Sequence, residues 1–364
     1  MVAPPVLAGY ILEELLARLV QSAGYRLLVH EAQDRVELKS KPNGDLQVKG
    51  RGGVHQVDVL GEFTVVPAFS QPVRLFIEAK ARGLATGLPA VRNAVGTIND
   101  VNEAWMVDYS RNRVRRHYRY ALFSTSGFSK PAQNYAIAHQ ISLIDLSGPE
   151  WASLVRVVHS STGHLLQAFP ADADHFPVRR LRRHLRLALG TMPDGLPPLP
   201  DDVESVEYDL DEAANIVARR FEAAVNGALL AFPAGHQVLL ARPDDLEAFL
   251  RYANRYPEHR VRLAIDPRPG RDGGRTWIVR PTSRDRGAYV LRLTLPAAVE
   301  AIALAESDRR AQSLAAKGQL GGRLDIFWDP YGEEVNLLRG PRFFRLVFAG
   351  ADLRHARLDK AEFG

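Results

Sequence analysis

Two short apolar segments carry acidic and basic side chains that could do chemistry together. In VHQVDVLGEF, Asp58 would point away from Val57 and Val59, because side chains alternate along a strand. In LFIEAK, Glu78 and Lys80 are two residues apart and would share one face of a second strand. If the strands pair, the two carboxylates could bind one hard divalent cation. The cation would polarise a phosphoryl oxygen while the ammonium oriented water or neutralised charge on phosphate, so the segments predict phosphodiester hydrolysis.

This spacing alone leaves simpler interpretations open. Glu78 and Lys80 could be surface residues of an edge strand, and Asp58 a polar residue beside a turn. His55 and Gln56 could reach phosphate or the reacting water from the mouth of the site, or be polar loop residues. Ser126, in the turn STSGFS ahead of a helix, could help to hold a phosphate or could belong to a helix cap.

The elements that must position these residues follow from apolar periodicity. A helix is predicted over 10–23, a hairpin turn at 42–45, and extended segments at 54–64 and 73–80. A helix over 89–107 is followed by a strand, a helix that begins near a proline, and a short last strand. This order predicts an α/β domain with a mixed sheet.

The length of 364 residues indicates two domains. The stretch 190–203 contains four prolines and two glycines, a composition typical of a linker. We therefore predict a catalytic domain over 1–160, a basic segment and linker over 161–203, and a second domain over 204–364. The second domain alternates helical patterns with short apolar runs, which predicts an α/β or α+β fold. It has no recognisable catalytic motif, so we expect it to recognise DNA, a ligand or a protein partner.

Composition limits the class of protein. The chain has no cysteine, which excludes disulfides, thiolate nucleophiles and cysteine-based zinc sites. No apolar run approaches the roughly 20 residues needed to cross a bilayer, so we expect a cytoplasmic protein without a membrane partner. The net charge of +5 is compatible with a polyanionic partner. A cluster of arginines suits phosphate contact or a solvated face: Arg179, Arg180, Arg182, Arg183 and Arg186.

The active-site segments resemble a known family. GRGGVHQVDVLGEF followed by FIEAK is similar to the active-site strands of the PD-(D/E)xK nuclease superfamily, in particular its Mrr-like restriction endonuclease branch. LEELLARLVQSAGY resembles the first helix of that branch, and FSTSGFSKPAQNYAIAHQISLIDLSG resembles its later strand, turn, helix and terminal strand. The similar segments follow the expected order over about residues 8–150. Two positions depart from the pattern: RGGVHQ lacks the acidic residue often found before the catalytic strand, and the lysine motif is Glu-Ala-Lys where many relatives have Gln.

The resemblance implies a fold, an activity and roles for single residues. It implies a restriction-endonuclease-like core, with Asp58 and Glu78 as metal ligands, Lys80 as the catalytic lysine, and Glu13 or Glu14 as a further acidic site residue. It implies Mg²⁺ as cofactor, with Mn²⁺ expected to substitute, and DNA as substrate, in restriction or another defence against foreign DNA. Cutting both strands with one site per chain leads us to expect a homodimer. Two alternatives remain: a repair or recombination nuclease, and an inactive DNA-binding module with a nuclease fold.

Overall fold

The computed structural model describes residues 3–41, 44–64, 66, 69–104, 114–148, 151–168, 176–193, 204–225, 227–233, 238–266, 275–283, 289–295, 297–328 and 342–350. The chain divides into two compact units. The first runs to Asn226 and the second begins at Gly227, apart from the short segments 148–150 and 330–334, which are assigned to the opposite unit.

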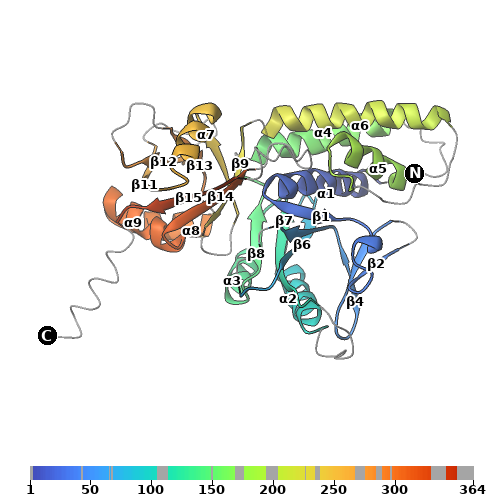
Figure 1. The fold of residues 1–364 in the computed structure, drawn as a ribbon, viewed down its shortest axis with the longest axis horizontal. Coiled ribbons are helices and arrows are strands. Elements are labelled where there is room, and N and C mark those ends of the chain that lie inside the picture. Colours follow the sequence, from blue (N-terminus) through green and yellow to red (C-terminus); the bar gives the residue numbers. More distant parts are fainter. Residues whose placement is uncertain are drawn as a thin grey trace. The chain divides into compact units, whose positions relative to one another are not determined.

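In the first unit, five of the described strands form a mixed sheet (Figure 1). Its order is β1-β5-β6-β7-β8, with antiparallel pairs β1–β5 and β5–β6 and parallel pairs β6–β7 and β7–β8. The strands are β1 (Tyr25–Leu28), β5 (Val59–Phe63), β6 (Val73–Lys80), β7 (His117–Ser124) and β8 (Ser142–Asp145). The predicted mixed sheet of an α/β domain is therefore confirmed.

Helices cover both faces of this sheet (Figure 1). On one side lie α1 (Pro4–Ser22), α4 (Ala152–Ala168), α5 (Val178–Ala188) and α6 (Glu204–Val225), and on the other α2 (Leu88–Asn102) and α3 (Lys130–Ala138). The first helix begins with a proline in its first turn and ends before Gly24, whose positive φ of 86° suits glycine. Gly61 of β5 lets this helix approach closely, since a Cβ there would lie 3.1 Å from the side chain of Val20.

The unit boundary lies after the expected one. We predicted that the second domain would begin at 204, but α6 packs against α4 and α5 and belongs to the first unit. The proline-rich stretch thus joins two helices of one unit, and its residues 194–203 lie outside the described part of the chain.

A small antiparallel sheet extends the first unit, with the order β2-β3-β4. Its strands are β2 (Leu38–Ser40), β3 (Leu46–Lys49) and β4 (Val54–Val57). A short 3₁₀ helix, η1 (Glu31–Gln33), precedes β2. The hairpin predicted around 42–45 is present as the β2–β3 pair. The single extended segment predicted over 54–64 is instead divided at Asp58 between the two sheets.

In the second unit, seven described strands close into a barrel with the order β10-β13-β12-β11-β15-β14-β9. They are β9 (Leu229–Pro233), β10 (Leu239–Pro243), β11 (Glu258–Ile265), β12 (Trp277–Pro281), β13 (Leu291–Leu293), β14 (Arg323–Trp328) and β15 (Arg342–Phe348). The accompanying helices are α7 (Leu246–Arg255), α8 (Ala297–Leu304) and α9 (Arg309–Gln319). The predicted mixture of helices and strands is confirmed, whereas closure into a barrel was not foreseen.

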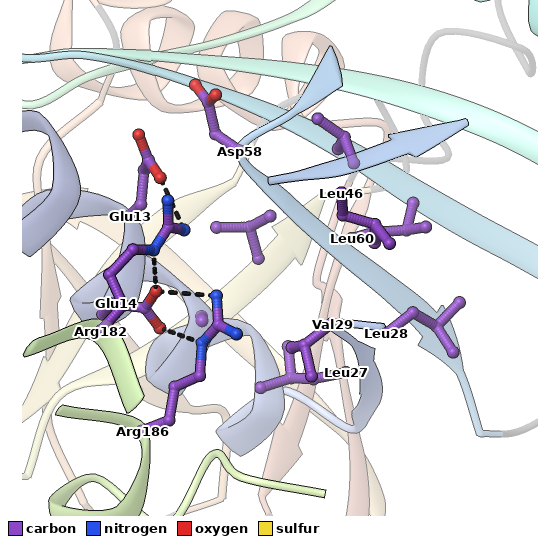
Figure 2. Close-up of a pocket in the computed structure, with 13 residues that line it drawn as sticks. Glu13, Glu14, Leu27, Leu28, Val29, Leu46, Asp58, Leu60, Arg182 and Arg186 are labelled. Atoms are coloured by element: carbon purple, nitrogen blue, oxygen red, sulfur yellow. Dashed lines mark hydrogen bonds and ion pairs between the residues drawn. The ribbon is translucent and has the colours of Figure 1, made fainter. Parts of the chain in front are cut away.

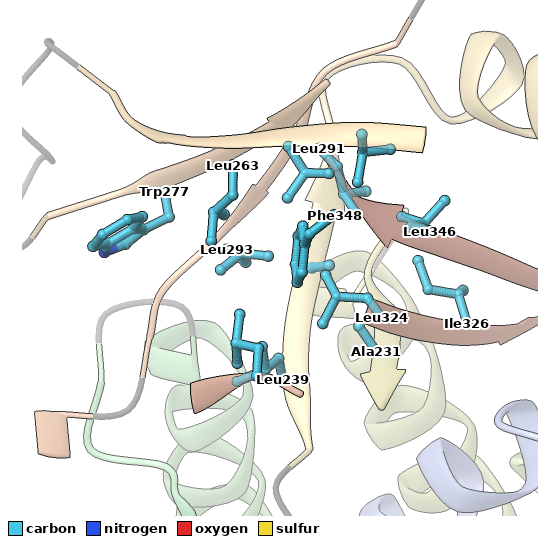
Figure 3. Close-up of a cluster of buried hydrophobic side chains, with 14 of the residues drawn as sticks. Ala231, Leu239, Leu263, Trp277, Leu291, Leu293, Leu324, Ile326, Leu346 and Phe348 are labelled. Carbon is cyan, nitrogen blue, oxygen red and sulfur yellow. The ribbon is translucent and has the colours of Figure 1, made fainter. Parts of the chain in front are cut away.

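Alternating apolar side chains fill the barrel (Figure 3). Val261, Leu263 and Val279 are almost fully buried, while the residues between them along the strands are exposed or less buried. On β11 this period-two pattern places apolar side chains inside the barrel and arginines on its outer face. Within the described part of the chain, no helix combines the length and apolar character needed to span a bilayer.

Candidate active site

Asp58 lies where the chain passes from the small sheet to the large one. The flanking Val57 and Val59 are buried, and the Asp58 side chain points to the opposite side, as strand alternation predicts. Its backbone N–H donates to the carbonyl of Ile77 over 3.2 Å, and its carboxylate accepts from the N–H of Ala79 over 2.8 Å. Asp58 is thereby fixed against the backbone of β6 at Ala79, which lies between Glu78 and Lys80.

Glu78 and Lys80 share one face of β6, as their spacing predicted, and form an ion pair with each other. Both are partly exposed, with 18% and 20% of their side chains accessible. Burial, together with the nearby charge of Glu78, raises the pKa of Asp58, although the hydrogen bond from Ala79 opposes this shift. Asp58, Glu78 and Lys80 are thus brought together at the same end of the paired strands.

Tyr120 is a neighbour of this site that the sequence did not indicate. It lies on β7, stacks on Phe76 with ring centroids 4.9 Å apart, and donates from its hydroxyl to Glu78 over 2.5 Å. Burial and the charge of Glu78 raise its pKa. Its only sequence signal is a tyrosine within an apolar strand, which usually indicates core packing.

The structure distinguishes the two candidate glutamates of α1. Glu14 is 2% exposed and accepts hydrogen bonds from Arg182 and Arg186 over 2.7–2.9 Å. Burial acts to raise the pKa of Glu14, but the charges of Arg186 and Arg182 outweigh it and hold that pKa below its usual value. Both carboxylate oxygens of Glu14 are therefore bound by arginines.

Glu13 lies on the Asp58 side of the same pocket (Figure 2). Burial raises its pKa to about 8, with Asp58 adding to the rise and Arg182 opposing it. The carboxylate oxygen of Glu13 is 2.8 Å from a guanidinium nitrogen of Arg182. Of the two glutamates, Glu13 is the one whose charge interacts with Asp58.

Arg182 of α5 is a buried counterion, which corrects its assignment as a DNA contact. Its guanidinium binds Glu13 and Glu14, lies 3.6 Å from Asp45, and stacks over the ring of Tyr10 at 5.1 Å. A guanidinium that is bound by carboxylates and closed off from solvent is not available to phosphate. The other arginines of this cluster that we predicted to contact DNA are more exposed to solvent. Arg179 is exposed, and Arg180 and Arg183 are partly exposed.

His55 and Gln56 are held by side chains away from Asp58. The Nε2 atom of His55 is 2.7 Å from Asp100, and the same carboxylate accepts from the backbone N–H groups of Gly52 and Gly53. Gln56 accepts from Lys41 over 2.7 Å. The glycine-rich approach to the catalytic strand is thus tied to α2, and neither polar residue contacts the three central residues in the described contacts.

Ser126 lies in the turn after β7. Its hydroxyl donates to the carbonyl of Arg82, and the cap of α3 comes instead from Ser129, which accepts from the N–H of Ala132. Ser126 therefore links the turn to the segment that follows β6. Among the residues that the structure describes, no group of three His, Asp or Glu side chains is arranged to hold a metal ion.

Comparison with known proteins agrees with this geometry. Residues 7–155 match the Mrr_cat family, described as restriction endonuclease. The match covers most of α1 and the segments that carry Asp58, Glu78 and Lys80. The first unit therefore contains a restriction endonuclease domain of the Mrr-like branch of the PD-(D/E)xK nucleases.

No curated protein is similar enough to the chain to match. The crystal structure of a protein of unknown function, AF1548, is 16% identical, with a TM-score of 0.31, and the alignment covers 59% of this chain and 97% of that one.

Proposed function

We propose that this chain is a divalent-metal-dependent endonuclease that hydrolyses the phosphodiester bonds of DNA, with Mg²⁺ as the working ion and Mn²⁺ as a substitute. The supporting observation is that Asp58, held by the N–H of Ala79, lies beside Glu78 and Lys80 at the end of two paired strands. The endonuclease domain matched over 7–155 supports DNA as the substrate.

The donor set suits a hard cation. Asp58 and Glu78 supply carboxylate oxygens, and Mg²⁺ is commonly bound by one or two carboxylates with water and substrate phosphate as the remaining ligands. Burial and the charge of Glu78 together raise the pKa of Asp58, as expected when two carboxylates share a site without a cation between them. A bound divalent ion would stabilise both charges and, when present, would supply Lewis-acid activation of the phosphate.

The chain's own side chains would orient the reacting groups and neutralise charge on the phosphate. Lys80 lies against Glu78, one of the two proposed metal ligands. Its ammonium can therefore reach a phosphate or water bound at the metal site. Tyr120 fixes the rotamer of Glu78 through its hydroxyl. Glu13, beside Asp58, is positioned to accept or hold a proton near the reacting water, whereas Glu14 holds α1 to α5.

The biological role that we propose is restriction or another defence against foreign DNA, acting as a homodimer so that both strands can be cut. The second unit would recognise a DNA feature, a ligand or a protein partner. The mass in solution by light scattering tests the dimer: a monomer that cuts both strands in one encounter would contradict it.

A plasmid cleavage assay tests the activity. Methylated and unmethylated supercoiled plasmids are incubated with the full chain in Mg²⁺, Mn²⁺ or EDTA, and we expect nicked or linear product only with metal. Asp58→Ala, Glu78→Ala and Lys80→Ala should each abolish cleavage while DNA binding persists. Glu247→Ala, an exposed carboxylate on α7, serves as the matched control and should cut normally.

The outcomes separate the alternatives. Wild-type cutting by any of the three site variants would remove the site assignment. DNA binding without cleavage in every metal would favour an inactive binding module. Cutting confined to branched or damaged DNA would favour a repair nuclease. Glu13→Ala should impair cleavage by more than its change in stability explains, whereas Glu14→Ala should act through stability, and full activity in both would exclude the α1 contribution.

A further inference from the structure

Three arginines project from the outer face of two neighbouring barrel strands. Arg260 and Arg262 are exposed residues of β11, and Arg280 is an exposed residue of β12. Val261, Leu263 and Val279, which alternate with them, are buried in the barrel. The three guanidinium groups therefore share one outward face, which we call the β11–β12 face.

The pairing of these strands places like charges against each other. Arg262 lies directly opposite Arg280 in the antiparallel register. Directly opposed side chains have Cβ atoms about 4.5–5.5 Å apart, and like charges there are destabilising. Lys317 of α9 lies near this face and donates to the carbonyl of Ala349 over 2.9 Å; burial lowers its pKa, and the charge of Arg262 lowers it further. The barrel thus maintains a positive surface at some cost in stability.

Two other arginines of the barrel, Arg292 and Arg345, are neutralised by neighbouring carboxylates. Arg292 pairs with Asp244 at 2.6 Å and also with Asp266, and Arg345 pairs with Asp325 at 2.9 Å. Within the described part of the chain, by contrast, the side chains of Arg260, Arg262 and Arg280 have neither an ion pair nor a hydrogen bond. This contrast indicates that the β11–β12 face is left open to an external anion.

The chemistry of the face favours a phosphate backbone. Arginine presents a planar fork that matches phosphate oxygens in two-point contact, and a row of such groups on a rigid sheet suits a repeating polyanion. A membrane-binding surface would need apolar anchors among the cations. The other outward positions along these strands are Glu258, Ala264, Ile278 and Thr282. Ile278 is apolar but only 7% exposed, and the others are acidic, small or polar, so the face offers no such anchor.

We propose that the β11–β12 face of the barrel, formed by Arg260, Arg262 and Arg280, is a second DNA-binding surface that contacts the phosphate backbone of a duplex. It lies outside the matched endonuclease domain, and it would add affinity without reading sequence. The choice of DNA as the polyanion rests on the proposed function.

Binding of the full chain to a fluorescent 30-base-pair duplex, in EDTA to prevent cleavage, tests this inference. Arg262→Glu with Arg280→Glu should weaken binding about tenfold or more and reduce the slope of log K against log salt by roughly 1.8, about 0.9 for each lost phosphate contact. Arg262→Gln with Arg280→Gln, which also removes the like-charge contact, should show a smaller loss of affinity with the same change in slope. Arg262→Lys with Arg280→Lys should retain most of the slope.

Arg219→Glu with Arg220→Glu is the matched control, because both are exposed arginines of α6 in the first unit. Equal affinities and slopes for the control and the β11–β12 variants would overturn the inference. A loss confined to anionic vesicles or polyglutamate, with DNA binding intact, would overturn it as well.

The plasmid assay in Mg²⁺ on the same proteins separates this inference from the proposed function. Cleavage by the wild type without any effect of the β11–β12 variants on DNA binding would remove the inference and leave the nuclease assignment standing. Arginine-dependent DNA binding without cleavage in any divalent metal would support the inference and remove the nuclease assignment.

Discussion

Arg182 donates from Nε to a carboxylate oxygen of Glu14 over 2.7 Å, although 168 residues separate the two in the sequence. Both side chains are almost fully buried, and the same guanidinium also binds Glu13. Helix α5, which follows the matched endonuclease domain, is therefore joined to the first helix of that domain at the edge of the candidate site.

Replacing Arg182 by methionine should lower the free energy of unfolding by roughly 3–5 kcal/mol, because removing one partner of a buried ion pair leaves an uncompensated charge. Hydrogen exchange at the amides of α1 and α5 measures this local loss. Arg183→Met, at the next and partly exposed position, should change stability by less than about 1 kcal/mol. Equal effects at the two positions would show that the buried network does not stabilise this edge.

The raised pKa of Glu13 should make stability depend on pH with a defined sign. With a pKa of about 8 in the folded protein and about 4.5 when unfolded, the folded state holds a proton that the unfolded state releases between these values. The stabilising contribution is therefore complete below pH 4.5 and is lost as the pH rises through about 8, at up to about 1.4 kcal/mol per pH unit.

Urea unfolding in EDTA at pH 5, 6, 7 and 8 measures this dependence. Glu13→Gln carries no titrating group, so its stability should fall less than that of the wild type over the same range. Glu14→Gln is informative as a contrast, because the pKa of Glu14 is lowered and its contribution is lost only on acidification. Parallel stability profiles for the wild type and Glu13→Gln would exclude a raised pKa at Glu13.

Tyr120→Phe should reduce the cleavage rate about tenfold or more, because Glu78 loses the hydroxyl that fixes its carboxylate near Asp58. The stability change should be only about 1 kcal/mol, since one hydrogen bond is lost and the ring still packs on Phe76. Single-turnover rates at increasing Mg²⁺ concentration distinguish the two effects. Tyr118→Phe, which alters a hydrogen bond to Glu37 away from the site, is the control, and a wild-type rate in Tyr120→Phe would reduce Tyr120 to a core residue.

Local pattern was sufficient to predict how the side chains of Asp58, Glu78 and Lys80 are placed. Strand alternation places Asp58 opposite its buried neighbours, and the two-residue spacing of Glu78 and Lys80 puts them on one face, so both facts are encoded within ten residues. The mixed sheet follows in the same way from the order of helical and extended segments. What the pattern did not indicate is that the strand is broken at Asp58 to join two sheets.

The remaining features depend on contacts between distant segments. In the sequence, an arginine cluster is equally compatible with a phosphate-binding face and with counterions for buried acids. Only the packing of α5 on α1 shows that Arg182 is a counterion. Arg74 is similar: it is 1% exposed and binds Asp34, Glu37 and Glu62, a network with no local signature. Barrel closure likewise requires β9 to pair with both β10 and β14, which no single segment reveals.

A fragment that ends at Asn226 should be soluble and should retain metal-dependent cleavage, because α6 packs on α4 and α5 and the contact boundary follows it. A shorter fragment that ends at 189 would leave α4 and α5 without their partner and should be less stable. The 1–226 fragment should also bind DNA with a shallower salt dependence than the full chain, since it lacks the arginines of the β11–β12 face.

Plasmid cleavage and duplex binding by the fragments 1–189 and 1–226 and by the full chain measure these differences side by side. Selectivity between methylated and unmethylated plasmid should change in 1–226 more than the requirement for metal does, because every residue assigned to the site remains. A folded 1–226 fragment that cuts no DNA, and that recovers activity when 227–364 is added in trans, would contradict this division. In that case the second unit would be needed to complete the active site or to bring two chains together.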